Sequence, residues 1–295
     1  MLFRSQPSWL SATTVVGTNW RGIAWSPQLG LFVAVGSATP YMAYSTDGKN
    51  WTAATAVVGT AWEGVAWSPQ LGLFAAVGSA TPYYAWSTDG KNWTGSSGLG
   101  GLGVTWSPDL GLFVSVGNGG IVSSQYSADG KTWTTATTNV PAYWYNVAWS
   151  PQLGLFAAAG SNAPGLMYSS DGKNWTAATT SPSTTGWFGI AWSPDLGLFV
   201  TGIYVGSATP FAYSTDGKNW TTATTQVGTS WYDITWISTH KMFVAVGSST
   251  PYVAYSLDGK NWIGAAPSGT TPRYCIAWAP ELGILTLGGS TTPYL

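Results

Sequence analysis

Apolar and polar positions follow one pattern that returns along the whole chain, and the first full unit shows it. Trp20 to Ser26 alternates large and small residues, Leu31 to Val35 is apolar throughout, and Tyr41 to Ser45 and Trp51 to Thr55 are two further short segments. Short segments of this kind, bounded by turn residues, are typical of β-strands, and a strand that is apolar on both faces lies between neighbouring sheets. We therefore predict four strands and no helix in each unit.

A tight turn is predicted between the third and fourth strands of each unit. Ser45 to Trp51 reads Ser, any residue, Asp, Gly, Lys, Asn, Trp. Asp-Gly between two apolar segments indicates a hairpin, because Asp bonds forward to turn N–H groups and Gly accepts positive φ. Six copies, one with Thr for Asn, begin at Ser45, Ser87, Ser127, Ser169, Ser214 and Ser256. We expect the Trp that follows each turn to be buried.

A second landmark repeats with the same period. Trp25 in the first strand recurs as Trp67, Trp106, Trp149, Trp192, Trp236 and Trp278, at intervals of 39 to 44 residues. Four antiparallel strands repeated at this period are typical of a β-propeller. We therefore predict one all-β domain over residues 1–295, with blades near 20–55, 62–97, 101–137, 144–179, 187–224, 231–266, and 273–295 joined by 1–14.

The number of blades is predicted from the two ends of the chain. Seven copies of the first two strands are present, but only six intact Asp-Gly turns. Gly289 to Leu295 matches Gly36 to Met42, Met1 to Ser5 resembles a third strand, and Trp9 to Thr14 matches a fourth. We therefore predict a seven-bladed propeller of four-stranded antiparallel blades, with the ring closed by pairing the N- and C-terminal segments in one blade.

Alternation in the first strand predicts how blades pack. Ile23 and Trp25 point to one side, whereas Gly22 and Ala24 point to the other, and Gly64 and its equivalents repeat the small positions. Our hypothesis is that the Ile and Trp face of one blade fills the space over the small face of the next.

Composition excludes several classes of partner. Charged residues make up only 7% of the chain, the net charge is −1, and six of the ten basic residues are turn lysines. No basic stripe is left for nucleic acid, and no apolar run of about 18 residues indicates membrane insertion. The single Cys275 excludes an internal disulfide. Residues 1–20 show no signal peptide, yet a surface covered by Ser, Thr, Asn and Gly favours an extracellular or virion-surface location.

The turn motif carries a resemblance to a known family. Ser-x-Asp-Gly-x-x-Trp resembles the Asp-box, or BNR-type repeat, of sialidases and related propellers, and the covering repeat is similar to Asp-box propellers of phages and large viruses. The family box has one more residue between Asp and Gly, whereas Gly48 follows Asp47 directly. The resemblance implies a folding role, not a catalytic one, for Asp47, Asp89, Asp129, Asp171, Asp216 and Asp258.

Two repeated features lie near the loops that meet on one face of a propeller. One is a Trp at the start of the first strand, and the other is a Gly-Ser-x-Thr-Pro-Tyr loop after the second. Aromatic faces beside hydroxyl groups suit sugars, and repetition would multiply weak sites on a multivalent glycan. The predicted ligand-binding residues are Trp20, Trp62, Trp144, Trp187, Trp231, Ser37, Thr39, Tyr41, Ser79, Thr81, Tyr83, Ser207, Thr209, Ser248, Thr250 and Tyr252.

Other interpretations stay open beside this one. The same Trp residues can pack between blades, and the loops can be turns without a ligand. The prediction is a non-catalytic, multivalent, lectin-like module that binds glycans. The alternative is a structural or protein-docking propeller of a virion or surface assembly, which would bind other surface proteins.

Catalysis is the third and weakest interpretation. A sialidase-like hydrolase would use the few charged residues Arg21, Glu63, Asp233 and Arg273 near the channel, but it needs three arginines around one carboxylate, and the chain has three in all. Glu63 and Asp233 lie one position apart in the repeat, so their side chains should point to opposite faces of their strands. We therefore predict no enzyme and no cofactor. His240 has no second His beside it, so no metal site is predicted.

Overall fold

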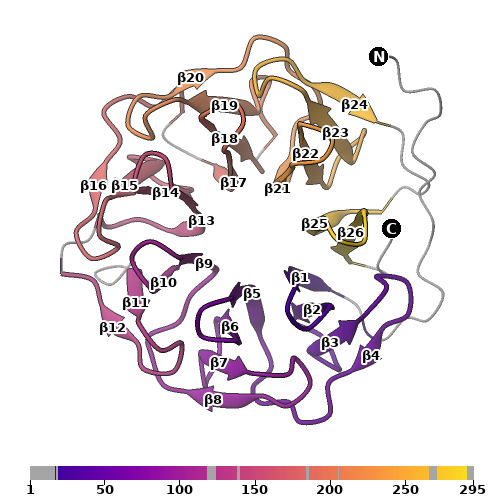
Figure 1. Cartoon of the computed structure of the whole chain (residues 1–295). Helices are drawn as coiled ribbons and strands as arrows, with labels where there is room; N and C mark the ends of the chain where they lie inside the picture. The colour runs from indigo at the N-terminus through magenta and orange to yellow at the C-terminus, as the bar shows by residue number, and fades with distance from the viewer. Residues whose placement is uncertain are drawn as a thin grey trace.

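The computed structural model describes residues 17, 19–117, 124–137, 140–183, 186–204, 206–265 and 271–290. These residues form strands and turns without a helix, so none of them builds a helix that could cross a membrane. Four kinds of strand, A to D, follow one another from the centre of the molecule to its rim (Figure 1).

The A strands are β1 (Trp20–Ser26), β5 (Trp62–Ser68), β9 (Gly103–Ser107), β13 (Trp144–Ser150), β17 (Trp187–Ser193), β21 (Trp231–Ile237) and β25 (Arg273–Ala279). The B strands are β2 (Leu31–Gly36), β6 (Leu73–Gly78), β10 (Leu112–Val116), β14 (Leu155–Gly160), β18 (Leu198–Ile203), β22 (Met242–Gly247) and β26 (Ile284–Gly289). The C strands are β3 (Met42–Ser45), β7 (Tyr84–Ser87), β11 (Ser124–Ser127), β15 (Leu166–Ser169), β19 (Phe211–Ser214) and β23 (Val253–Ser256). The D strands are β4 (Thr52–Ala53), β8 (Thr94–Ser96), β12 (Thr134–Thr135), β16 (Thr176–Ala177), β20 (Thr221–Thr222) and β24 (Ile263–Ala265).

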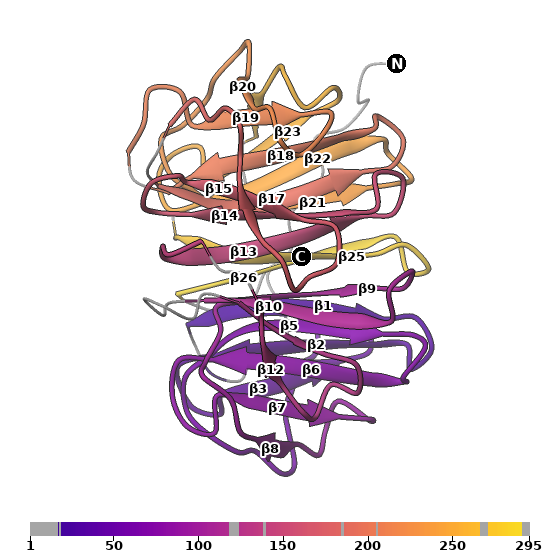
Figure 2. The same cartoon turned by 90° about the vertical axis from the view of Figure 1, so that its left-hand side faces the viewer.

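The sheets stand around a central axis, and Figure 2 shows them from the side. Each A strand contacts the A strand of the next sheet, and β25 contacts both β21 and β1, so the ring is closed. The B strands are the centre of each sheet; β2, for example, is buried at every position. Because the B strands are covered on both faces, the apolar core lies between neighbouring blades, as the sequence predicts.

The predicted number of blades is wrong. The described residues form six four-stranded antiparallel blades and one two-stranded sheet, β25–β26, in place of a seventh blade. Within the described residues, β26 pairs with β25 alone. The segments 1–5, 9–14 and 291–295, to which we assigned the remaining strands, lie outside the described residues.

The predicted Asp-Gly turns are present, and their side chains explain the motif. Asp47 accepts hydrogen bonds through Oδ1 from the backbone N–H groups of Lys49 (2.8 Å) and Asn50 (2.7 Å), and through Oδ2 from the Asn50 amide (2.7 Å). Ser45 Oγ donates to Asp47 Oδ1 (3.0 Å) and accepts from the Gly48 N–H (2.9 Å). Gly48 has a φ of 70°, which a side chain would disfavour. Asp47 therefore holds the turn together.

A ring of hydrogen bonds joins neighbouring blades at their A to B turns. The indole Nε1 of Trp67 donates to Gln28 Oε1 of the preceding blade (2.6 Å), and the amide of Gln28 donates back to the Pro69 carbonyl (3.2 Å). Trp25 joins the first blade to the β25–β26 sheet by donating to Glu281 Oε2 (2.7 Å) in the turn of that sheet. The residue two positions after the end of the A strand makes this link at every junction except the one between the sixth blade and the β25–β26 sheet, where Thr239 stands at that position and Trp278 Nε1 has no hydrogen-bond partner among the described residues.

Removing one such link is expected to cost about 1 kcal/mol of unfolding free energy, because one indole N–H and one backbone carbonyl lose their partners. Gln70 is a suitable site, since its Oε1 accepts from Trp106 Nε1 (2.7 Å). Gln70→Ala should lower the urea midpoint, and Gln70→Glu, which keeps the acceptor, should retain most of the stability. Equal stability of Gln70→Ala and the wild type would contradict this role.

Turn lysines form a second ring of contacts that the sequence analysis missed. Lys218 Nζ lies 5.2 Å from the ring centroid of Tyr168 in the preceding blade, and Lys131 Nζ lies 4.2 Å from that of Trp86. Lys91, Lys173 and Lys260 make the same contact with Tyr44, Tyr126 and Tyr213. The turn aspartates do not hold these lysines through their side chains, because the carboxylates accept hydrogen bonds within the turn itself. The aromatic residue just before each box Ser was the available signal.

Candidate functional site

A β-bulge in the A strands aims side chains at the axis. In β5, Trp62 pairs with Gly78 and Gly64 pairs with Val77, so Glu63 has no partner in the ladder. The same register shift occurs at the start of β1, β13, β17, β21 and β25. Bulges re-aim side chains, and here the second residue of these six A strands faces the centre, as does the residue just before β9. The residues are Arg21, Glu63, Leu102, Tyr145, Phe188, Tyr232 and Tyr274.

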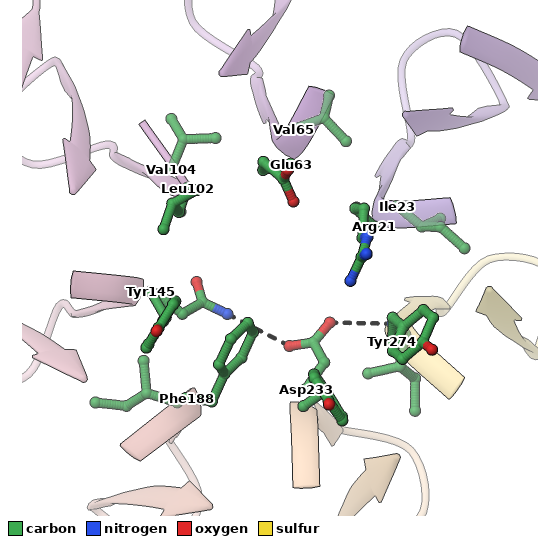
Figure 3. A pocket seen from close by; sticks show the side chains of 17 residues that line it. Arg21, Ile23, Glu63, Val65, Leu102, Val104, Tyr145, Phe188, Asp233 and Tyr274 are labelled. Atoms are coloured by element: carbon green, nitrogen blue, oxygen red, sulfur yellow. Dashed lines mark hydrogen bonds between the residues drawn. The ribbon is translucent and has the colours of Figure 1, made fainter. Parts of the chain in front are cut away.

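These side chains enclose a cavity of about 440 Å³ on the axis, lined by all seven sheets. Figure 3 shows Arg21, Glu63 and Asp233 pointing into the same space from different sides. The expectation that Glu63 and Asp233 face different ways is therefore wrong. The bulge adds one residue to β5 and to β21, so the second residue of one (Glu63) and the third of the other (Asp233) both reach the cavity.

Aromatic rings form a continuous group on one side of this space. Tyr145 stacks on Phe188 with ring centroids 4.4 Å apart, and Phe188 meets Tyr204 and Tyr232 edge to face at 5.2 Å. Tyr232 meets Tyr274 edge to face at 5.0 Å. The hydrogen bond with the Tyr145 hydroxyl, together with partial burial, raises the pKa of Tyr204 to about 12. We call these five residues the aromatic wall.

Arg21 and Glu63 line the rest of the cavity, and Arg21 lies against one end of the aromatic wall. The Arg21 guanidinium lies over the Tyr274 ring, 4.7 Å from its centroid. Glu63 Oε1 accepts a hydrogen bond from Ser79 Oγ (3.4 Å). Burial raises the pKa of Glu63, although the charge of Arg21 and the Ser79 hydrogen bond act in the lowering direction. Ser79, one of the predicted loop residues, is thereby linked to the cavity.

Asp233 is the second carboxylate of the cavity, and its hydrogen bonds come from neutral donors. Its Oδ1 accepts from the Ile234 N–H (2.9 Å) and from Asn146 Nδ2 (3.5 Å), and its Oδ2 accepts from the Ile276 N–H (3.0 Å). Burial raises the pKa of Asp233 to about 7, against the lowering effect of the bonds from Ile276 and Ile234. Asp233 thus changes protonation near neutral pH, in contrast to the turn aspartates.

The predicted Trp residues do not form an exposed ring. Trp20, Trp62, Trp144, Trp187 and Trp231 are 0–1% exposed. Trp62 shows why: it pairs with Gly78, whose missing side chain leaves room for the indole, and its Nε1 donates to the Val58 carbonyl (2.9 Å). The packing interpretation describes these residues, and the expectation that their faces meet a ligand is wrong. Arg273, which replaces a Trp in β25, is likewise buried.

The predicted loops lie at the surface. Thr39, Thr81, Thr209 and Thr250 are exposed, as are Ser37 and Ser79, whereas Ser207 and Ser248 are half-buried. Tyr41, Tyr83 and Tyr252 are half-buried and have positive φ values of 66°, 64° and 60°. Ligand contact by these loops stays a prediction. The loops offer hydroxyl groups at repeated places around the ring.

Other reactive side chains lie apart from the cavity or are buried beside it. Cys275 in β25 is buried, and burial together with the nearby Asp233 raises the pKa of its thiol. His240 is exposed in a turn, edge to face with Trp278. In the part of the chain that the structure describes, no three His, Cys, Asp or Glu side chains gather as a metal site would require.

The solved structures that this chain resembles are β-propellers. The streptogramin B lyase structure superposes with a TM-score of 0.80 at 8% identity, over 97% of this chain and 95% of that one. YCF48 bound to D1 peptide gives 0.70 at 16% identity, over 99% and 95%. The GH74 enzyme of Niastella koreensis gives 0.67 at 19% identity, over 95% of this chain and 43% of that one. No protein-family model and no curated protein matches the chain in sequence. These identities show the fold alone.

Proposed function

We propose that this propeller is a non-catalytic binding module that takes up carbohydrate in its central cavity. The observation that carries the proposal is the aromatic wall, which shares one cavity with Arg21, Glu63, Asp233 and Asn146. A pyranose offers C–H groups to aromatic faces, and its hydroxyl groups need both donors and acceptors at close range. Arg21 and Asn146 supply donors, and the two carboxylates supply acceptors.

The surface loops add to the proposal. Exposed threonines recur at the same place in blades one, two, five and six. Weak contacts at repeated loops would strengthen the binding of a multivalent glycan without any new strong site. Display on a cell or virion surface agrees with a chain of which only 7% is charged. Both points are parts of the proposal and are tested with it.

Removing a ring from the aromatic wall is expected to weaken glycan binding about fivefold, because one stacking contact contributes about 1 kcal/mol. A glycan array would first identify a ligand, and calorimetry would compare the wild type with Tyr145→Ala and Phe188→Ala. Tyr143→Ala is the matched control, since Tyr143 is 45% exposed and does not line the cavity. Equal losses in all three variants would contradict a site at the wall. Hydrolysis of the bound glycan, abolished by Glu63→Gln, would contradict a non-catalytic role.

Protein docking is the second candidate, and one specific feature favours it. Leucines of the A to B turns are 37–42% exposed: Leu29, Leu71, Leu110, Leu153, Leu196 and Leu282. Repeated exposed leucines are typical of interaction surfaces. A propeller of the same fold, YCF48, has been solved with a peptide. Absence of binding to every glycan on the array, with binding to a surface protein lost in Leu71→Ser, would favour docking over carbohydrate.

A further inference from the structure

The two carboxylates of the cavity differ in their access to positive charge. The charge of Arg21 acts to lower the pKa of Glu63, against the raising effect of burial, but it is not among the causes of the shift of Asp233. Within the described residues, the one ion pair closer than 4.0 Å joins Lys241 and Asp195, in turns away from the cavity. Asp233 therefore accepts hydrogen bonds from neutral groups and forms no ion pair within 4.0 Å with a described residue.

A buried carboxylate without a cation is unfavourable when it is charged. Three neutral donors reduce that cost, yet the pKa of Asp233 still rises to about 7. A proton occupies the carboxylate below that pH, and above it the charge stays uncompensated. A ligand that brings its own positive charge would remove this cost, whereas a neutral ligand would not.

The aromatic wall lies on the same side as Asp233. Tyr232 directly precedes Asp233 in β21, and Phe188 meets the Tyr232 ring edge to face. Faces of Tyr and Phe attract organic cations, and desolvation increases that attraction to about 2 kcal/mol. Carboxylate and aromatic faces together are the chemistry that recognises an alkylammonium group.

We infer that the ligand of this cavity is an amino sugar, whose ammonium group pairs with the carboxylate of Asp233 while its ring lies against the aromatic wall. The inference rests on the proposed carbohydrate-binding function and adds the substrate class. Arg21 and Glu63 then face the hydroxyl groups on the far side of the ring, where one is a donor and the other an acceptor.

The test uses three β-1,4-linked oligosaccharides of equal length that differ at carbon 2. Chitosan oligomers carry an ammonium group there, chitin oligomers an acetamide, and cello-oligosaccharides a hydroxyl. Calorimetry on the full chain is expected to show the ammonium form binding at least about tenfold more tightly than the other two. Asp233→Asn keeps the acceptor oxygen and should reduce that preference below about twofold. Asp109→Asn, which changes an exposed turn carboxylate, should keep it.

A second measurement on the wild type does not depend on any variant. N-trimethylated chitosan oligomers keep their charge at every pH, so their affinity should rise as the pH passes upward through about 7, where Asp233 loses its proton. Binding below that pH should release a proton, which calorimetry in two buffers of different ionisation enthalpy detects. The titratable or charged groups around Asp233 are Arg21, Glu63, Tyr145, Tyr232, Tyr274 and Cys275. Burial raises the pKa of Glu63 as well, so the effect is assigned to Asp233 only if the Asp233→Asn profile loses it.

The outcomes separate the two proposals. Equal affinity for the ammonium, acetamide and hydroxyl forms would overturn the amino-sugar inference and leave carbohydrate binding intact. An affinity for trimethylated oligomers that is independent of pH would also overturn the inference. Absence of binding by all three forms, together with a negative glycan array, would overturn the proposed function itself.

Discussion

Replacing Gly103 by Ala is expected to destabilise the propeller by about 3 kcal/mol, because the added methyl group would overlap the backbone of the next blade. A Cβ at Gly103 would lie 2.6 Å from the Cα of Asn146 and 2.7 Å from the Tyr145 carbonyl oxygen. Both distances are shorter than a Cβ tolerates. Because both neighbours are backbone atoms, no side-chain rotation can relieve the overlap. The A strands of blades three and four would have to separate.

Thermal and urea unfolding would measure the effect, with Gly111→Ala as the control. Gly111 has a φ of 61° and nothing within 4 Å of an added Cβ, so Ala there costs only its unfavourable backbone conformation, about 1 kcal/mol. Gly103→Ala should lower the thermal midpoint by several degrees more than the control does. A smaller loss at Gly103 than at Gly111 would show that the blades can move apart without cost.

The same contact corrects our packing hypothesis. A Cβ at Gly64 would meet the Leu102 carbonyl oxygen at 2.8 Å, and one at Gly22 would meet the Glu63 carbonyl oxygen at 3.1 Å. At its glycine positions the small face of each A strand is therefore covered by the backbone of the next A strand. At its alanine positions the hypothesis is confirmed, since Ala148 lies in one core cluster with Ile190 and Trp192 of the next blade, and Ala191 in one with Ile234 and Trp236. Alternation in the sequence showed that these positions must be small, but it could not show which atoms approach them.

Local chemistry explains why the blades could be predicted so closely. The expected segment Trp20 to Ser26 is β1, and Leu31 to Val35 lies within β2. The third and fourth strands were expected slightly too long, since β3 begins at Met42 and β4 covers Thr52–Ala53. Apolar alternation and Asp-Gly turns fix these elements through neighbouring residues, so one sequence contains the information.

The blade count and the cavity depend on distant residues, and the predicted count, the exposed Trp ring and the orientation of Glu63 relative to Asp233 were wrong. Completion of the β25–β26 sheet requires pairing between the two ends of the chain, which no local pattern specifies. The cavity depends on a bulge in strands such as β5. The one inserted residue reverses the face of the strand toward which Glu63 points. The buried Trp62 did have a signal, because Gly78 recurs at the end of the B strand opposite most of these Trp residues and leaves space for an indole.

Acid is expected to unfold the propeller through its turn aspartates, and Asp216→Asn tests this at one turn. Partial burial acts to raise the pKa of Asp216, but hydrogen bonds from the Asn219 backbone and amide, the Lys218 N–H and the Ser214 hydroxyl outweigh it and lower the pKa to about 2. The equivalent hydrogen bonds lower the pKa to about 2 in Asp47, Asp89 and Asp171. They also lower the pKa values of Asp129 and Asp258.

The direction of the pH effect follows from that shift. A carboxylate with a lower pKa in the folded state than in the unfolded state stabilises the fold above the unfolded value, about 4, and loses that contribution as the pH falls to about 2. Six turns act together, so the free energy of unfolding should fall steeply between these two values. Asp216→Asn lacks one of the six contributions. Its free energy of unfolding should therefore fall less steeply with decreasing pH than that of the wild type.

At neutral pH the loss from Asp216→Ala should be about 2 kcal/mol, since two backbone N–H groups and one amide lose their acceptor. Asp216→Asn should lose less, because an amide oxygen can still accept from Lys218 and Asn219. Urea unfolding from pH 5 to pH 2.5 would compare both with the wild type, and the stability difference for Asp216→Asn should shrink toward low pH. A difference that stays constant over this range would show that the charge of Asp216 does not stabilise the turn, and that its oxygen atoms alone do.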